Sequence, residues 1–190
     1  MLDEVPLRVR EYADQAVAYV QRALGIKLEY DSNTLPVLDH YLRTVPDDQP
    51  AALQLVVATS GAYFGEVVRK LLGGRWELGT TNADWRVILP TGIHFSPAGF
   101  VAAAIAKADL DDLDSEIGAP PRMLPYVQAA LARMGEVSVD EYYSLCGRLD
   151  TLEHVHEILV GVAAQMLGDT PEDDDADGAE PSDEPNGPVN

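Results

Sequence analysis

The chain has few of the groups on which several common functions depend. Cys146 is the only cysteine among the 190 residues, so no disulfide can form within the chain, which is typical of a reducing compartment. Lys and Arg number 13 against 32 Asp and Glu, which gives a formal net charge of -19 at pH 7 and a pI near 4.3. Because this charge repels phosphate groups, we expect no direct binding of nucleic acid or of an anionic membrane surface.

Long hydrophobic runs are also missing. The longest strictly apolar stretches, such as residues 100–106, fall far short of the roughly 20 residues that span a bilayer. Asp3 and Glu4 stand where a signal peptide would carry basic residues. We therefore expect a cytoplasmic protein that does not associate with membranes.

The acidic charge divides between a tail and a body. Residues 169–190 hold nine acids, no Lys or Arg and almost no large apolar side chain, so we expect a disordered acidic tail. Residues 1–168 keep 23 acids and 13 bases, a net charge of -10. The overall composition, 46% hydrophobic and 24% charged, is that of a soluble globular protein, and the body has the size of one domain.

The apolar periodicity predicts a helix-dominant α+β domain with a small antiparallel sheet of three to four strands. The longest helix is expected over residues 50–72, where it forms the centre of the fold and ends at Gly73-Gly74. Three short strands are expected to pack on it at 75–78, 85–89 and 93–95, with 26–30 as a fourth candidate. The chain then divides into an α+β core (1–108), an acidic loop (109–121), C-terminal helices packed on the core (122–168) and the tail (169–190).

Local signals predict where several helices begin. Ser96 has the features of an N-cap, with Phe95 and Phe100 placed to form a hydrophobic staple across it. Ser138 opens a capping box, and Asp150 is expected to begin a further helix that reaches residue 167.

The densest motif lies in the middle of the predicted central helix. Gly61 and Gly65 occupy neighbouring turns, although each glycine inside a helix costs about 1 kcal/mol relative to alanine. The interpretation that we favour is packing, in which the glycines allow another element to approach the helix backbone closely. The alternative is a binding groove lined by five nearby side chains: Tyr63, Glu66, Arg69, Trp76 and Trp85.

This motif also carries a resemblance. The segment Gly61-Ala62-Tyr63-Phe64-Gly65-Glu66, followed by Gly74-Arg75-Trp76, resembles the pattern of an uncharacterised bacterial family of α+β domains. In that family, a helix with a Gly-Tyr-x-Gly-Glu core runs into a Gly-Trp and a small sheet. The resemblance covers about residues 28–105 and implies an α+β fold without a known activity, so it assigns no catalytic residue.

Patterns for metals and catalysis are incomplete. His156 begins a sequence like that of the zinc proteases, but Val160 stands where the second histidine ligand should be. Glu153 and His156 form half of a di-iron motif that has no second half, and the acids of 109–116 do not follow the spacing of a calcium loop. Cys146 is expected to be a buried thiol. We therefore expect no cofactor, no metal and no catalytic residue.

Three functions remain open after these exclusions. The first is a non-catalytic protein-interaction or adaptor domain, and the second is an acidic inhibitor or immunity-type protein that neutralises a basic partner. The third is a hydrolase or metalloenzyme whose residues, for example Glu66, His94 and His156, converge only in space. A protein partner is expected in the first two cases, and association of identical copies is left open. A deep pocket with histidines and carboxylates would favour the enzyme, an apolar patch the interaction domain, and an acidic face without apolar content the inhibitor.

Overall fold

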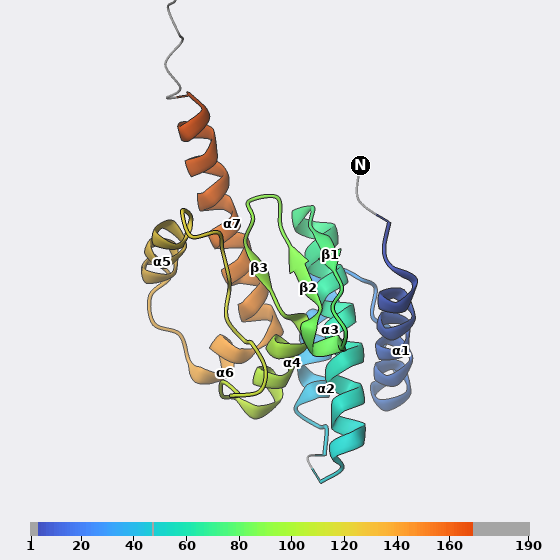
Figure 1. Cartoon of the computed structure of the whole chain (residues 1–190). Coiled ribbons are helices and arrows are strands. Elements are labelled where there is room, and N and C mark those ends of the chain that lie inside the picture. The colour runs from blue at the N-terminus through green and yellow to red at the C-terminus, as the bar shows by residue number, and fades with distance from the viewer. Residues whose placement is uncertain (1–3, 47, 169–190) are drawn as a thin grey trace, which may run out of the picture.

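Helix α3 (Pro50–Leu72) passes through the centre of the molecule, with α1 (Leu7–Leu24) along one side and the sheet in front of it in the view of Figure 1. The computed structural model describes residues 4–46 and 48–168. The C-terminal helix α7 (Leu145–Gly168) lies on the side opposite α1, and its last turns extend beyond the rest of the body (Figure 1).

The observed elements confirm a helix-dominant α+β fold with a small antiparallel sheet. The sheet has the order β1-β2-β3, with Trp76 opposite Val87 and Val87 opposite Phe95. Over the described ranges the remaining helices are η1 (Ser32–Thr34), α2 (Leu35–Leu42), η2 (Asn82–Asp84), α4 (Pro97–Ala106), α5 (Leu124–Arg133) and α6 (Val139–Tyr143), and the strands are β1 (Arg75–Glu77), β2 (Arg86–Ile88) and β3 (His94–Phe95).

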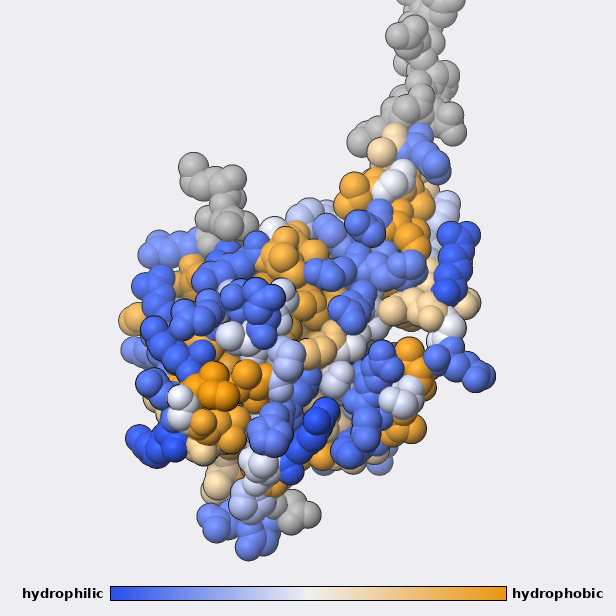
Figure 2. Space-filling model, turned by 180° about the vertical axis from the view of Figure 1, so that it is seen from behind, coloured by the Kyte–Doolittle hydropathy of each residue, from blue (hydrophilic) through white to orange (hydrophobic). Residues whose placement is uncertain are grey.

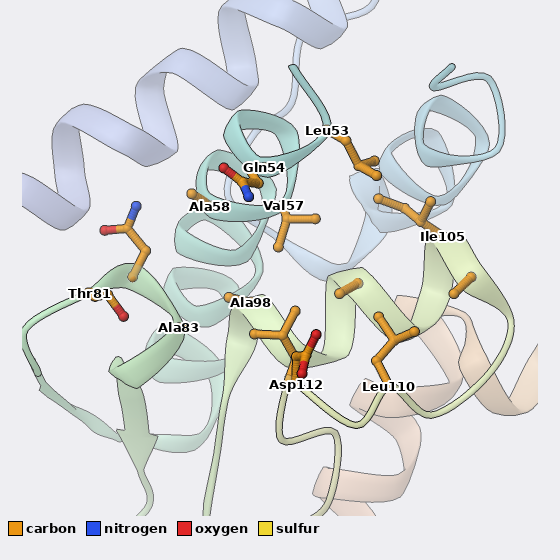
Figure 3. Close-up of a pocket in the computed structure, with 14 residues that line it drawn as sticks. Leu53, Gln54, Val57, Ala58, Thr81, Ala83, Ala98, Ile105, Leu110 and Asp112 are labelled. Atoms are coloured by element: carbon orange, nitrogen blue, oxygen red, sulfur yellow. The ribbon is translucent and has the colours of Figure 1, made fainter. Parts of the chain in front are cut away.

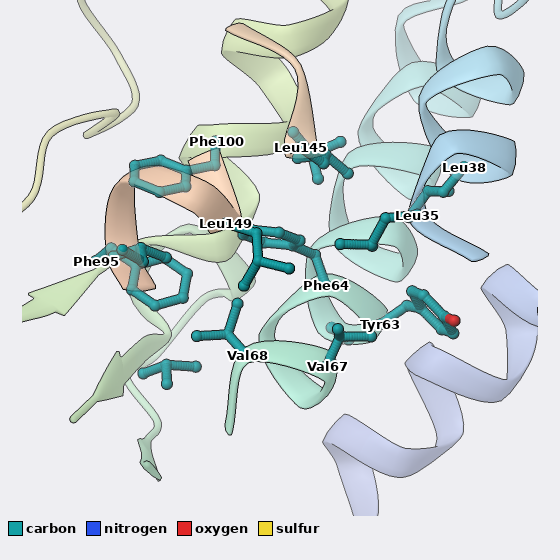
Figure 4. Close-up of a cluster of buried hydrophobic side chains, with 14 of the residues drawn as sticks. Leu35, Leu38, Tyr63, Phe64, Val67, Val68, Phe95, Phe100, Leu145 and Leu149 are labelled. Carbon is teal, nitrogen blue, oxygen red and sulfur yellow. The ribbon is translucent and has the colours of Figure 1, made fainter. Parts of the chain in front are cut away.

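The core forms around α3 because other elements cover the middle of this helix. Every residue from 58 to 69 is buried. Figure 4 shows Phe64 facing Phe95 and Phe100, and its ring lies 5.9 Å from that of Phe95. By length and composition α3 could cross a membrane, but 67% of its most apolar 18-residue window is buried inside the fold, as in the core helix of a globular protein.

The glycines of α3 lie where neighbouring groups approach closely. A Cβ atom on Gly61 would lie 2.9 Å from the backbone nitrogen of Ala98, at the start of α4. A Cβ atom on Gly65 would overlap the ring of Trp76. The close backbone approach that the sequence predicts is therefore present at Gly61, while at Gly65 an indole ring fills the space.

The predicted start of α4 is confirmed. The Ser96 hydroxyl accepts a hydrogen bond from the Gly99 amide at 3.1 Å, and the rings of Phe95 and Phe100 stack with their centroids 5.0 Å apart. The Ser138 hydroxyl likewise accepts from the Glu141 amide at the start of α6.

The strand predicted at residues 26–30 is wrong, because side chains take the backbone donors that a strand partner would need. The Glu29 amide donates to the Thr34 hydroxyl, and the Tyr30 amide donates to the Tyr63 hydroxyl at 2.9 Å. Tyr30 also has a positive φ of 57°, which turns the chain away from an extended conformation. Only Leu28 in this segment is buried in the core.

The helix start predicted at Asp150 is also wrong, because α7 begins at Leu145 and passes through this position. The Asp39 carboxylate, from α2, accepts from the backbone amides of Leu145 at 2.7 Å and Cys146 at 3.1 Å. The Ser144 hydroxyl accepts from the Gly147 amide. A side chain 106 residues away in sequence therefore supplies part of the cap of α7.

The predicted acidic loop is non-helical over 109–121 and contacts the body. His94 and Gly118 form an isolated antiparallel bridge, and the Tyr143 hydroxyl donates to the Asp109 carboxylate at 3.3 Å. The prediction of a disordered tail falls on residues 169–190, which lie outside the described residues.

Candidate functional site

The five residues predicted to line a binding groove lie together, on α3 and the sheet that follows it. The Glu66 carboxylate accepts from Arg69 Nε at 2.8 Å and from the indole nitrogen of Trp76. Glu66 is only 4% exposed and Arg69 only 5%. A buried ion pair with additional hydrogen bonds fixes the geometry of the end of α3 against β1.

Tyr63, on the same helix, connects α3 to the segment that precedes α2 through hydrogen bonds of its hydroxyl group. Its hydroxyl accepts from the Tyr30 amide and lies 3.0 Å from the Thr34 hydroxyl. Burial raises the pKa of the Tyr63 phenol, so the side chain stays neutral. These contacts make Tyr63 an anchor for the turn at Tyr30.

Trp85, the residue immediately before β2, completes the group. It is 2% exposed, and its ring meets those of Trp76 and Tyr12 edge-on, with centroids 6.3 and 5.6 Å apart. None of the five residues lines the α3–α4 region's apolar pocket, the small pocket beside Asp39 or the acidic pocket at residues 109–116. Their burial favours the packing interpretation, and a binding role for them stays a prediction.

The residues of the enzyme hypothesis are engaged in separate local contacts. Glu66 binds Arg69 and Trp76, His156 Nδ1 lies 3.1 Å from the Thr91 hydroxyl, and the His94 ring packs against Gly118. Burial lowers the pKa of His156. Within the described residues, no group of three or more His, Cys, Asp or Glu side chains has the arrangement of a metal site.

Cys146 lies half-buried in the first turn of α7. Burial, together with the nearby Asp39 carboxylate, raises the pKa of its thiol to about 12. Because the thiolate is the reactive form, this environment keeps the sulfur unreactive near neutral pH.

An open apolar groove of about 720 Å³ lies between α3 and α4, and we call it the α3–α4 groove. Figure 3 shows Leu53 and Val57 on α3, Ile105 on the facing helix α4, and Thr81 on the loop at the far side. Its lining consists of Leu53, Gln54, Val57, Ala58, Thr81, Asn82, Ala83, Ala98, Ala102, Ile105, Ala106, Leu110, Asp112 and Leu113.

The groove exists because α3 and α4 meet closely at one end and carry short side chains along their shared face. Gly61 allows the contact with Ala98, and the alanine methyl groups of Ala58 and Ala102 leave space beside it. Larger apolar side chains, Leu53 and Ile105 among them, stand at the borders of this space. The result is an apolar surface without any histidine, lysine or arginine in its lining.

The acidic loop forms one wall of the groove and a second pocket next to it, of about 440 Å³. Leu110, Asp112 and Leu113 line both pockets. The only basic side chain of the second pocket is Arg86, which lies 3.5 Å from the Asp114 carboxylate. Six carboxylates line this second pocket: Asp84, Asp109, Asp111, Asp112, Asp114 and Glu116.

Sequence reasoning did not find this groove, although two signals were present. The apolar positions of α3 include Leu53 and Val57 in addition to a complete core face. The apolar surface of this helix is therefore wider than packing against the core requires. Leu110 and Leu113 stand among acids in a loop, where apolar side chains have no reason to occur unless they contact something.

Comparisons with family models, with curated proteins and with solved structures found no match. The resemblance of residues 61–76 to an uncharacterised bacterial family therefore stays a prediction. The function has to be argued from the groove and its surroundings.

Proposed function

We propose that this protein is a non-catalytic protein-interaction domain that binds a segment of a partner in the α3–α4 groove. The observation that carries the proposal is the continuity of the open apolar groove with the acidic pocket beside it. The partner segment presents apolar side chains to α3 and α4, and Lys or Arg side chains to the acidic loop.

The apolar part of the groove would supply most of the affinity. Leu53, Val57 and Ile105 are only partly buried in the free protein, so a partner's side chains would remove them from water. Burial of apolar area contributes about 25 cal/mol for each Å². A hydrophobic groove between helices is a common binding site for the apolar face of a segment from another chain.

The acidic loop would select the charge of the partner. Six carboxylates and one arginine line the second pocket, so basic groups are attracted to this side of the groove and acidic groups are repelled. At physiological ionic strength the attraction between exposed charges extends about 8 Å, and added salt shortens this range. The binding that we propose therefore weakens as salt is added.

The acidic pocket also supports a second function, an inhibitor or immunity-type protein that covers a basic site on another protein. In that case the charges alone would recognise the partner, and the apolar groove would contribute little. The two functions differ in whether the partner needs apolar side chains.

A designed helical peptide of Leu and Lys, with a fluorescent label, tests both functions. We expect the full-length protein to bind it, as measured by fluorescence anisotropy, and to bind more weakly in about 0.5 M than in about 0.05 M NaCl. A peptide with Leu replaced by Ser should lose most of the affinity, and one with Lys replaced by Glu should not bind. Full binding of the Ser peptide would instead favour the inhibitor.

Matched variants locate the binding on the protein. Ala106→Trp fills the groove from its exposed edge, whereas Ala18→Trp places the same ring on the exposed face of α1. We expect the first to weaken binding at least about tenfold and the second to leave it unchanged. Asp112→Asn should weaken binding about two- to fivefold, while Glu11→Gln, which removes the same charge from α1, should not. Equal affinities for all four variants would contradict the proposal.

A further inference from the structure

Arg148, in the first turn of α7, carries a buried positive charge. Figure 2 shows hydrophilic side chains spread over the surface of the body, where water can pair with their donors and acceptors. Arg148 is only 4% exposed. In the described part of the chain, the buried charged residues are Asp39, Glu66, Arg69 and Arg148. Because a buried charge is normally paired and hydrogen-bonded, the surroundings of the Arg148 guanidinium need an explanation.

Arg148 lacks the partners that the other buried arginine has. Arg69 donates from Nε and Nη2 to the two carboxylate oxygens of Glu66, at 2.8 and 3.2 Å. The Nε and Nη2 atoms of Arg148 are enclosed but have no hydrogen-bond acceptor among the residues that the structure describes. These two nitrogens lie on one edge of a guanidinium and match the two oxygens of a carboxylate. We call them the Arg148 fork, which is the fork of Arg69 without its carboxylate.

Three aromatic rings surround the Arg148 guanidinium. Its Cζ atom lies 4.7 Å from the ring centre of Phe100 on α4, and 4.6 and 5.4 Å from those of Tyr142 and Tyr143 on α6. Figure 1 shows α4, α6 and α7 meeting at this end of the body. The rings stabilise the positive charge through their faces, but they offer no oxygen to the N–H groups. They hold the guanidinium in place while the fork stays without an acceptor.

Acidic side chains around this junction serve other donors. The Asp39 carboxylate accepts from backbone amides at the start of α7, and the Asp109 carboxylate accepts from two hydroxyl groups. Asp140 on α6 pairs with Lys107 at 2.6 Å. The Arg148 fork is thus left for a carboxylate that the described residues do not supply.

We propose that the Arg148 fork binds the carboxylate of a small organic acid, in the way that Arg69 binds Glu66. Tyr142 provides the route, because its ring contacts the guanidinium and the residue is 48% exposed. Exposed side chains change rotamer within nanoseconds, so rotation of Tyr142 opens the fork to a small molecule. The site is independent of the α3–α4 groove, whose lining contains neither Arg148 nor any of the three rings around it.

The charge of the protein selects among anions. The full chain has a formal net charge of -19, which repels an approaching anion in proportion to the charge of that anion. A singly charged carboxylate is therefore favoured over phosphate, which carries more charge near neutral pH. Salt at about 0.15 M screens charges beyond about 8 Å and leaves the direct contact with Arg148. We expect acetate to bind with a dissociation constant of about 1–50 mM, and phosphate more weakly.

NMR spectra of the arginine Nε–H groups in the full chain test the proposal. Sodium chloride is replaced stepwise by sodium acetate at a constant total of about 0.15 M, so that the ionic strength does not change. The Arg148 signal should begin upfield of the Arg69 signal, because its Nε–H has no acceptor, and should move downfield as acetate binds. The Arg69 signal is the internal control and should stay in place, since Glu66 already fills that fork.

Three results would overturn the proposal. The first is an Arg148 signal that does not move as acetate replaces chloride. The second is an Arg148 signal that already lies beside that of Arg69 before acetate is added, because a carboxylate of this chain would then fill the fork. The third is a larger shift with phosphate than with acetate at equal concentration, which would indicate a general anion site.

Matched variants separate the fork from its charge, with acetate binding followed by the ring signals of Tyr143. Arg148→Lys keeps the charge but loses the fork, so the dissociation constant should rise at least about tenfold. Arg133→Lys, the same change at an exposed position on α5, should leave it unchanged. Tyr142→Ala removes the cover and keeps Arg148, so acetate should bind at least as tightly as before, which also tests the site if Arg148→Lys does not fold. Equal binding by the two lysine variants, or loss of binding in Tyr142→Ala, would contradict the proposal.

Discussion

A single methyl group added to Gly61 tests how tightly α3 and α4 are packed. In Gly61→Ala the new Cβ would lie 2.9 Å from the Ala98 nitrogen, 3.0 Å from the Ala98 Cα and 3.1 Å from the Pro97 carbonyl carbon. These neighbours are backbone atoms, so no side chain can turn away to make room. The two helices must separate by roughly half an ångström to reach ordinary contact distances of about 3.5–4.0 Å.

Two opposing terms set the size of the effect. Alanine is a better helix former than glycine by about 1 kcal/mol, which favours the variant. Overpacking of a rigid contact costs about 1–3 kcal/mol, and the absence of a movable neighbour places Gly61 at the upper end of that range. We therefore expect a net loss of about 1–2 kcal/mol in the free energy of unfolding.

Urea denaturation followed by circular dichroism measures this loss, with Gly161→Ala as the control. Gly161 is also inside a helix, but a Cβ there would meet nothing within 4 Å, so the same change should stabilise the protein by about 0.5–1 kcal/mol. A Gly61→Ala protein as stable as Gly161→Ala would refute the close contact between α3 and α4, and with it the origin of the groove.

Three further changes test local features of the structure. Asp39→Ala removes an acceptor from the start of α7 and should cost about 1–2 kcal/mol in urea denaturation, whereas an unchanged midpoint would mean that Asp39 does not act as a cap. Burial lowers the pKa of His156 below the unfolded value of about 6.5, so its contribution to stability is present above that pH and is lost as the pH falls. His156→Gln should therefore reduce the loss of stability between about pH 7.5 and 5.5, and equal losses in both proteins would argue against a buried neutral imidazole. Cys146, with its thiol pKa near 12, should react slowly with a thiol reagent at about pH 8 in the native protein and rapidly in urea; fast native reaction would contradict its burial.

Features with local causes could be predicted from the sequence. The bounds of α3 match the predicted 50–72, because an uninterrupted apolar pattern ends at Gly73. Ser96 with the ring pair Phe95 and Phe100 marked the start of α4, since a cap and a staple need only a few neighbouring residues.

Features that depend on distant parts of the chain could not be predicted. The alternating residues 26–30 have the pattern of a strand, but hydroxyl groups of Thr34 and Tyr63 take their amide donors. The start of α7 depends on Asp39, more than 100 residues away, so Asp150 looked like the better N-cap within its own segment. The correct position lies at Ser144.

The site was the part least accessible to sequence reasoning. The motif around Gly61 drew attention to five side chains that the structure places together, four of them buried. The groove instead combines positions from α3, η2, α4 and the acidic loop, which are separated by as many as 60 residues. Only the fold brings Leu53, Ile105 and Leu113 to one surface.

The most direct test of the proposed function is a map of where the basic apolar peptide binds. Amide and methyl NMR spectra of the full chain are recorded with and without the Leu-Lys peptide. We predict that the signals that shift belong to Leu53, Val57, Ile105, Leu110 and Leu113, and that signals from α1 stay in place. Shifts spread over the whole acidic surface, or gathered away from the α3–α4 groove, would contradict the assignment of this groove as the binding site.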